Sequence, residues 1–281
     1  MSLEILNAQS VSKWFATMGD GGTTGDPFFS IPADFYTEVQ KGNVVNHSIV
    51  HKYGRNGGVP NGSFEGVLQA SAQFNFLTAA TTVRIKAGGN AADTAAGAGT
   101  QAVTIEGLDD TGAFVSESVE LAGASASSAT TALFWRVFRA YITPLRAGAY
   151  GVANTGDIMI ENSGGGTDLI VILAGEGQTQ YGAYAIPLAT TGYLLSVAFF
   201  SDSTKQSDFK MYTRASLTDF TTPFAPKLIK NYWDGVAGGL LLKPKSPMLV
   251  MPALTDIWFE AQGSGAVSEV SVDFEILLVD D

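Results

Sequence analysis

The sequence predicts an all-β protein, an antiparallel β-sandwich or jelly-roll-like body that follows a mostly irregular N-terminal arm. Three observations predict this class. From about residue 63 onward apolar side chains recur at every second position, Gly, Pro, Asn and Asp punctuate the series, and no helical stripe of comparable length interrupts it. A parallel sheet needs crossover connections, usually helices, so strands without them are expected to pair antiparallel.

Residues 1–62 are expected to form the arm. Alternation is poor there, and turn-forming residues crowd 19–27 and 54–58, although short helices are expected over 10–18 and 32–40. The segment has bulky aromatic residues but no pattern of its own with which to bury them. We expect these residues to lie against a partner's surface: Trp14, Phe15, Phe28, Phe29, Phe35 and Tyr36.

The strands of the body are predicted in two halves or subdomains, residues 63–175 and 176–281. In the first half they fall at 83–86, at 103–108 and 114–121 (a hairpin around Asp109-Asp110-Thr111-Gly112), and at 133–142, 157–161 and 169–173. In the second half they fall at 182–186, 193–200, 209–214, 227–233, 240–242, 256–261 and 270–278. The last strand alternates most cleanly, with one face apolar and the other polar. Whether the two halves form one sandwich or two stays open.

The amino-acid composition argues against several classes of function. The chain carries a net charge of −11 without a cluster of Lys and Arg, which argues against a nucleic-acid partner. It contains no cysteine, which excludes disulfides and thiolate metal sites. No signal peptide and no apolar stretch of membrane-spanning length is recognisable, so we expect synthesis in the cytoplasm and no membrane partner. Only 15% of the residues are charged, which favours a subunit of an assembly.

The histidines do not form a convincing metal or catalytic motif. His47 and His51 stand four residues apart, a spacing that would serve a zinc site on a helix. The β-branched residues between them favour a strand, on which the two rings would lie about 13 Å apart. Ser264 lies between two glycines but is expected in a hairpin loop, so a Ser-His-Asp site is not supported. We expect no cofactor and no metal ion.

The carboxylates and glycine-rich loops do not form a recognisable catalytic or phosphate-binding motif either. A glycosidase would need two paired carboxylates, and the aspartates fall in turns or at the terminus, while the strand glutamates are expected on solvated faces. The run Gly164-Gly165-Gly166-Thr167 lacks the lysine of a phosphate-binding loop and is expected to be a hairpin turn. Calcium among turn oxygens such as those of Asp109 and Asp110 stays open. The chain is expected not to be an enzyme.

Two arginines interrupt an aromatic strand. Arg136 and Arg139 are expected either to stack on aromatic rings or pair with a carboxylate across an interface, or to extend from the edge of the sheet into solvent.

Four parts of the chain carry a resemblance to known proteins: 47–56, 79–90 with 93–99, 103–109 and 272–280. Taken together, they resemble a family of uncharacterised virion-associated proteins of tailed bacteriophages and prophages, and the resemblance runs over residues 40–281. Their motifs describe strands and turns rather than a reaction centre. The resemblance implies a structural role in the particle, and it carries no catalytic residues.

The sequence predicts one function and leaves one alternative. The expected function is a non-enzymatic virion protein, assembled in the host cytoplasm, that decorates the capsid or belongs to the tail. Its arm would attach to major capsid or tail proteins, and the chain would be a homo-oligomer, with a trimer preferred by analogy. The alternative is a receptor- or carbohydrate-binding module. Its loops would present aromatic side chains to sugars: Trp135, Tyr181, Tyr232 or Trp233.

Overall fold

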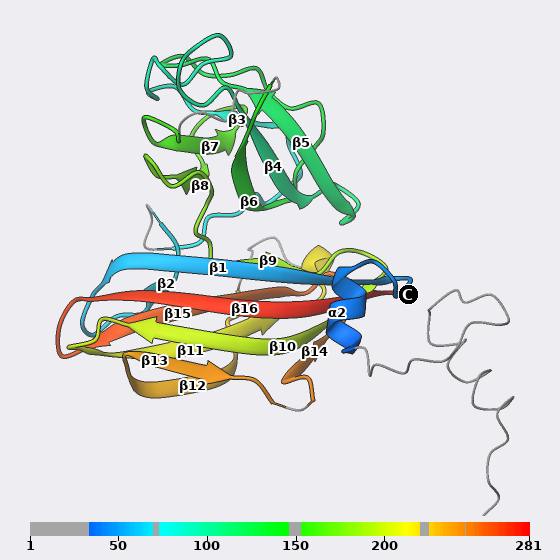
Figure 1. Ribbon diagram of the computed structural model, residues 1–281, viewed down its shortest axis with the longest axis vertical. Helices are drawn as coiled ribbons and strands as arrows, with labels where there is room; N and C mark the ends of the chain where they lie inside the picture. Colours follow the sequence, from blue (N-terminus) through cyan, green and yellow to red (C-terminus); the bar gives the residue numbers. More distant parts are fainter. Residues whose placement is uncertain (1–33, 70–72, 146–152, 220–224, 245) are drawn as a thin grey trace, which may run out of the picture.

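The computed structural model describes residues 34–69, 73–145, 153–219, 225–244 and 246–281, and within them the protein is built from antiparallel β-sheets (Figure 1). Every pairing between named strands is antiparallel, which confirms the predicted all-β class. The described strands fall into four sheets, and their arrangement is not clearly a jelly-roll. Two larger sheets form what we call the body, and two smaller ones form what we call the insertion.

In the first sheet of the body, the first strand of the described chain pairs with the last. Its order is β1 (His47–Val59), β16 (Ser268–Asp280), β10 (Thr190–Ser201) and β13 (Gly239–Leu242), and β14 (Leu249–Met251) also pairs with β10. The alternation predicted for the last strand is confirmed, because Val270, Val272, Phe274 and Ile276 are buried while the residues between them are less so. The short helix α2 (Phe35–Gln40) packs on this sheet and confirms part of the helix expected over 32–40.

The second sheet of the body packs against the first. Its order is β12 (Leu228–Ala237), β11 (Gln206–Arg214), β15 (Asp256–Ser264) and β2 (Glu65–Gly66), and β9 (Ala183–Ala185) also pairs with β15. Aromatic rings meet between the two sheets. Phe199 of β10 lies 4.6 Å from Phe209 and 5.8 Å from Phe259, and Phe259 lies 5.0 Å from Phe274 of β16 (centroid distances). A short 3-10 helix spans Leu217–Asp219.

The insertion comprises strands β3 to β8 and lies above the body in Figure 1. One sheet is β3 (Val83–Ile85), β7 (Ile158–Asn162) and β8 (Asp168–Ile172), and the other is β5 (Phe114–Glu120), β4 (Ala102–Leu108) and β6 (Arg136–Thr143). The hairpin predicted around Asp109 is confirmed. Asp109 Oδ1 accepts hydrogen bonds from the N–H groups of Thr111 and Ala113, and Gly112 has a positive φ of 86°.

The insertion changes the predicted organisation of the chain. Strand β2 lies in the first predicted half, yet it joins the same sheet as β9, β11, β12 and β15 from the second half. The predicted seam at 175/176 falls between β8 and β9, where the chain returns from the insertion to the body. One apolar core nevertheless spans both units, since Ile105, Phe138 and Ile160 of the insertion belong to the same buried cluster as Phe199 and Phe259.

The prediction that residues 1–62 form a mostly irregular arm is wrong for residues 47–59. Residues 47–59 form the thirteen-residue strand β1 rather than an irregular segment, and they pair with β16 along most of its length. The sequence predicts that the glycines at 54–58 form turns. Gly54 instead lies where β1 passes so close to residues 67 and 182 that a Cβ atom would overlap their backbones. The helix expected over 10–18 lies outside the described residues.

Candidate functional site

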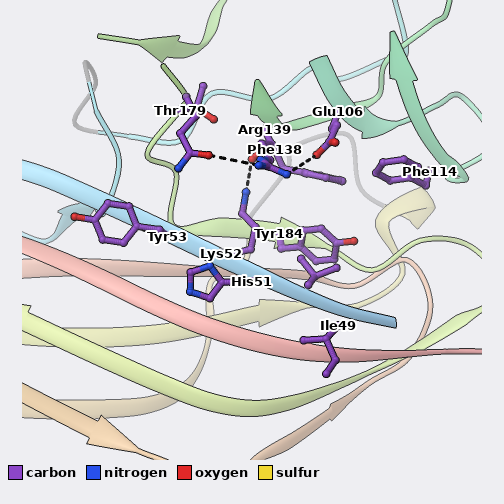
Figure 2. Close-up of a pocket in the computed structure, with 12 residues that line it drawn as sticks. Ile49, His51, Lys52, Tyr53, Glu106, Phe114, Phe138, Arg139, Thr179 and Tyr184 are labelled. Atoms are coloured by element: carbon purple, nitrogen blue, oxygen red, sulfur yellow. Dashed lines mark hydrogen bonds and ion pairs between the residues drawn. The ribbon is translucent and has the colours of Figure 1, made fainter. Parts of the chain in front are cut away.

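A groove of about 400 Å³ lies between the body and the insertion (Figure 2). Strand β1 supplies one wall through residues 49–53. The insertion supplies the other through Glu106, Phe114, Phe138 and Arg139, and residues 178, 179 and 184 complete the lining as the chain returns to the body. The groove therefore combines apolar rings with both signs of charge.

Lys52 is the buried charged group of this groove. Its neighbours on β1, His51 and Tyr53, point to the opposite side of the strand, because side chains alternate, and Lys52 itself is only 5% exposed. Its Nζ donates a hydrogen bond to the backbone carbonyl of Phe138 and lies 5.6 Å from the centroid of the Phe138 ring. Figure 2 shows the side chain rising from β1 toward β6.

The surroundings of Lys52 disfavour its charge. Burial and, to a smaller extent, the positive charge of Arg139 lower the pKa of Lys52 to about 7, although the carboxylate of Glu106 acts in the opposite direction. Burial also raises the pKa of Tyr184, and the charge of Glu106 adds to that effect. Lys52 is therefore an ammonium group near neutral pH that readily gives up its proton.

Arg139 is the second cation of the groove. Its Nη1 lies 3.5 Å from Oε2 of Glu106, its Nη2 donates to Oε1 of Gln178 at 3.4 Å, and its guanidinium carbon lies 4.6 Å from the Tyr141 ring centroid. Both polar distances are at the long end for such contacts, so the guanidinium retains hydrogen-bonding capacity. Chemically the groove can donate hydrogen bonds from two cations beside apolar walls.

The structure separates the two arginines that the sequence singled out together. Arg136 is buried and makes a bidentate ion pair with Asp256 of β15, with Nε–Oδ1 and Nη2–Oδ2 distances of 3.1 Å. It also lies over the rings of Phe76 and Trp135. The expected stacking and carboxylate pairing are thus present, but the interface is internal. Only 3% of the Arg136 side chain is exposed, and its contact with a partner protein stays a prediction.

Two of the six arm aromatics lie in the described part of the chain. Tyr36 packs on the protein's own sheet beside Val39, Leu195 and Leu277, whereas Phe35 is 45% exposed. Four lie outside the described residues: Trp14, Phe15, Phe28 and Phe29. Contact of these residues with a partner stays a prediction.

The histidines lie on a strand, as their β-branched neighbours favoured. His47 Nδ1 donates to the carbonyl of Val45 at 2.8 Å, and His51 Nε2 contacts the carboxylate of Asp273 on the neighbouring strand β16. Among the described residues no three His, Asp or Glu side chains are placed to hold a metal ion. Each ring therefore has a separate structural partner.

The remaining candidates occupy structural positions. The glycines at 164–166 form the turn between β7 and β8, with positive φ at Gly165 and Gly166, which confirms the predicted hairpin. Ser264 is the last residue of β15 and exposed, where the chain passes from one body sheet to the other. Glu117 accepts hydrogen bonds from the backbone N–H groups of Thr131 and Ala132, so it braces a loop.

Sequence reasoning missed one carboxylate pair. Asp208 of β11 and Asp234 of β12 lie side by side, and neither lines the groove. Burial raises the pKa of Asp208, but hydrogen bonds from the Gly235 N–H and the Gln262 amide outweigh it and lower that pKa. The charged form is thereby stabilised, which suits a structural role. The pair could not be found from sequence because the two positions meet only through strand pairing.

Comparison with known proteins assigns no family. No family model matches the chain, and no curated protein matches it. Among solved structures, the isomalto-dextranase of Arthrobacter globiformis T6, in a complex with panose, matches at 13% identity and a TM-score of 0.22. The match covers 80% of this chain and 36% of that one. At this level it carries no argument about fold or activity. Within the described chain, no helix is long and apolar enough to cross a membrane.

Proposed function

We propose that this chain is a non-enzymatic structural protein of a tailed-phage virion, a capsid decoration or tail-associated subunit. The sequence resemblance supports this proposal, and so does one feature of the body. Exposed apolar side chains recur along the edge strands on one side: Leu228, Ile229 and Tyr232 of β12, Leu241 of β13 and Val250 of β14. We call these five residues the edge surface.

Among the described residues, the edge surface combines apolar side chains with a strand edge that pairs with no other strand. Strand β12 ends the order β12-β11-β15-β2, and its residues 228–232 are exposed on both faces of the sheet. Natural proteins normally protect such edges with charges, proline or a covering segment, since they otherwise pair with other chains. Within residues 228–232 Lys230 is the one charged side chain, so most of this stretch lacks that protection, as expected of a surface that a neighbouring subunit covers.

The proposal assigns separate roles to the parts of the chain. The two five-stranded sheets would serve as the sandwich body, and the edge surface would contact a second copy or a neighbouring capsid or tail protein. The N-terminal arm, through its aromatic residues, would add a second attachment point. Contacts from an arm enlarge an interface without enlarging the domain.

Mass spectrometry of purified particles of the encoding phage is the primary test. The chain should be present in a fixed ratio to the major capsid or tail protein, and its absence from particles would refute the proposal. Replacing Ile229 with Lys should lower its incorporation, because a charge would be buried in the contact. The same change at Val267, which is 56% exposed but lies outside the edge surface, is the matched control.

A carbohydrate-binding role is the second candidate, and one observation favours it. Tyr232 is 44% exposed and lies 6.4 Å from Phe64, an aromatic pair at the surface beside Lys210. Of the other aromatics expected to reach sugars, Tyr181 is in the core, which removes it as a candidate. A glycan array tests this role. Binding that is lost in Tyr232→Ala supports it, and a protein inert to glycans excludes it.

A further inference from the structure

The groove contains a charged group whose hydrogen-bonding capacity is mostly unused. The ammonium of Lys52 has three N–H donors. Among the described residues it donates one hydrogen bond, to the neutral backbone carbonyl of Phe138. No carboxylate of the described chain lies within ion-pair distance of its nitrogen. A buried charge without a counter-ion is costly, and proteins rarely retain one without a partner.

The neighbouring groups do not supply that partner. Glu106 is the acidic group of the groove that acts on Lys52, but its carboxylate already faces Arg139 at 3.5 Å. The charged and titratable groups around the groove are Glu106 on β4, Arg139 on β6, Tyr184 on β9, and His51 and Tyr53 on β1. His51 is engaged with Asp273 on the other side of β1. Two cations therefore share one carboxylate.

We propose that this groove binds a small organic acid, a carboxylate carried on an apolar body. The geometry supplies both halves of such a ligand. Lys52 and Arg139 offer spare donors for the carboxylate, and the rings of Phe114, Phe138 and Tyr184 offer an apolar wall for the rest. A volume of about 400 Å³ is within the range of small-molecule sites.

Arg139 acts in this site as an orienting group. Its planar guanidinium favours two-point contact with a carboxylate, and its long contacts with Glu106 and Gln178 are easily exchanged for better ones. Lys52 contributes a compact charge from the buried side. The bound carboxylate would be the counter-ion that Lys52 lacks, so binding should also raise the pKa of Lys52 from about 7 toward its ordinary range.

Calorimetric titration with benzoate, using benzamide as the neutral analogue, tests the proposal. The wild-type protein should bind benzoate saturably and benzamide much more weakly. Lys52→Met keeps an unbranched side chain one atom shorter and removes its charge, and it should weaken benzoate binding by about 10- to 100-fold. Lys86→Met is the matched control, since Lys86 is a lysine of the insertion paired with Asp168 outside the groove.

A second measurement does not depend on a variant. NMR of lysine side chains labelled with ¹³C at Cε follows the titration of Lys52 directly in the wild-type protein. Saturating benzoate should move that titration to higher pH, and the affinity should fall about tenfold per pH unit above the pKa of the free protein. Equal binding of benzamide, equal binding by Lys52→Met, or a titration of Lys52 that ignores benzoate would each overturn the proposal. Presence or absence of the chain in virions is a separate result.

Discussion

Replacing Lys52 with Met should stabilise the protein near neutral pH, because the wild-type fold buries a charge there. Burial and Arg139 lower the pKa of Lys52 from 10.5 to about 7. Each unit of pKa corresponds to about 1.4 kcal/mol, so the difference of about 3.5 sets an upper limit of about 5 kcal/mol on the cost of keeping the folded protein charged at that position. Methionine fills similar space and carries no such cost.

The sign of the pH dependence follows from proton counts. Between pH values of about 7 and 10.5 the unfolded chain keeps the Lys52 proton while the folded protein has released it, so wild-type stability rises with pH across that window. Lys52→Met lacks this contribution. Its advantage over the wild type should therefore shrink by about 3 kcal/mol on going from about pH 7 to about pH 9.5.

Urea denaturation of both proteins at a series of pH values measures this advantage. The difference between the two free energies of unfolding isolates Lys52, because the other lysines and tyrosines titrate alike in both proteins. A difference that stays constant with pH would refute the reasoning, since it would mean that Lys52 keeps an ordinary pKa in the folded protein. Loss of stability in Lys52→Met at pH 7 would contradict it as well.

Three further substitutions test the packing by urea or thermal denaturation. Asp256→Ala leaves its buried arginine partner without a counter-ion and should cost about 3–5 kcal/mol; a cost below about 1 kcal/mol would contradict the buried pair. Gly54→Ala should prevent β1 from docking, because its Cβ would overlap neighbouring backbone, whereas Gly57→Ala meets open space and should cost far less. Phe199→Ala should cost about 3–5 kcal/mol and the adjacent Phe200→Ala much less, since the first ring is fully buried and the second is 49% exposed; equal costs would contradict the placement of β10.

Much of the fold could be predicted from sequence because its signals are local. Alternation along 270–278 identified β16, and the turn residues around Asp109 identified the β4–β5 hairpin. The same signals led to a wrong prediction for 47–59, because glycine is common both in turns and where two backbones lie close together. At Gly54 it permits a close approach of backbones rather than a turn, and the segments it approaches lie far away in the sequence.

The groove could not be predicted, because its parts meet only in the folded chain. Lys52 is buried by the insertion, and its carbonyl partner on Phe138 is 86 residues away. Its own neighbours on β1 are polar or half-exposed and give no sign of that burial. The cations and aromatics around 134–141 did give a local signal. It left two alternatives open for Arg136, and the structure shows the first, stacking and carboxylate pairing, with Asp256 of the same chain as the partner.

A reconstruction of the phage particle by cryo-electron microscopy tests the central proposal most directly. We expect density for this chain at repeated positions on the capsid or tail, with the edge surface of β12, β13 and β14 covered by a neighbouring subunit. A mature particle that lacks the chain would contradict the proposed function. A chain present with that surface fully open to solvent would contradict the role assigned to it.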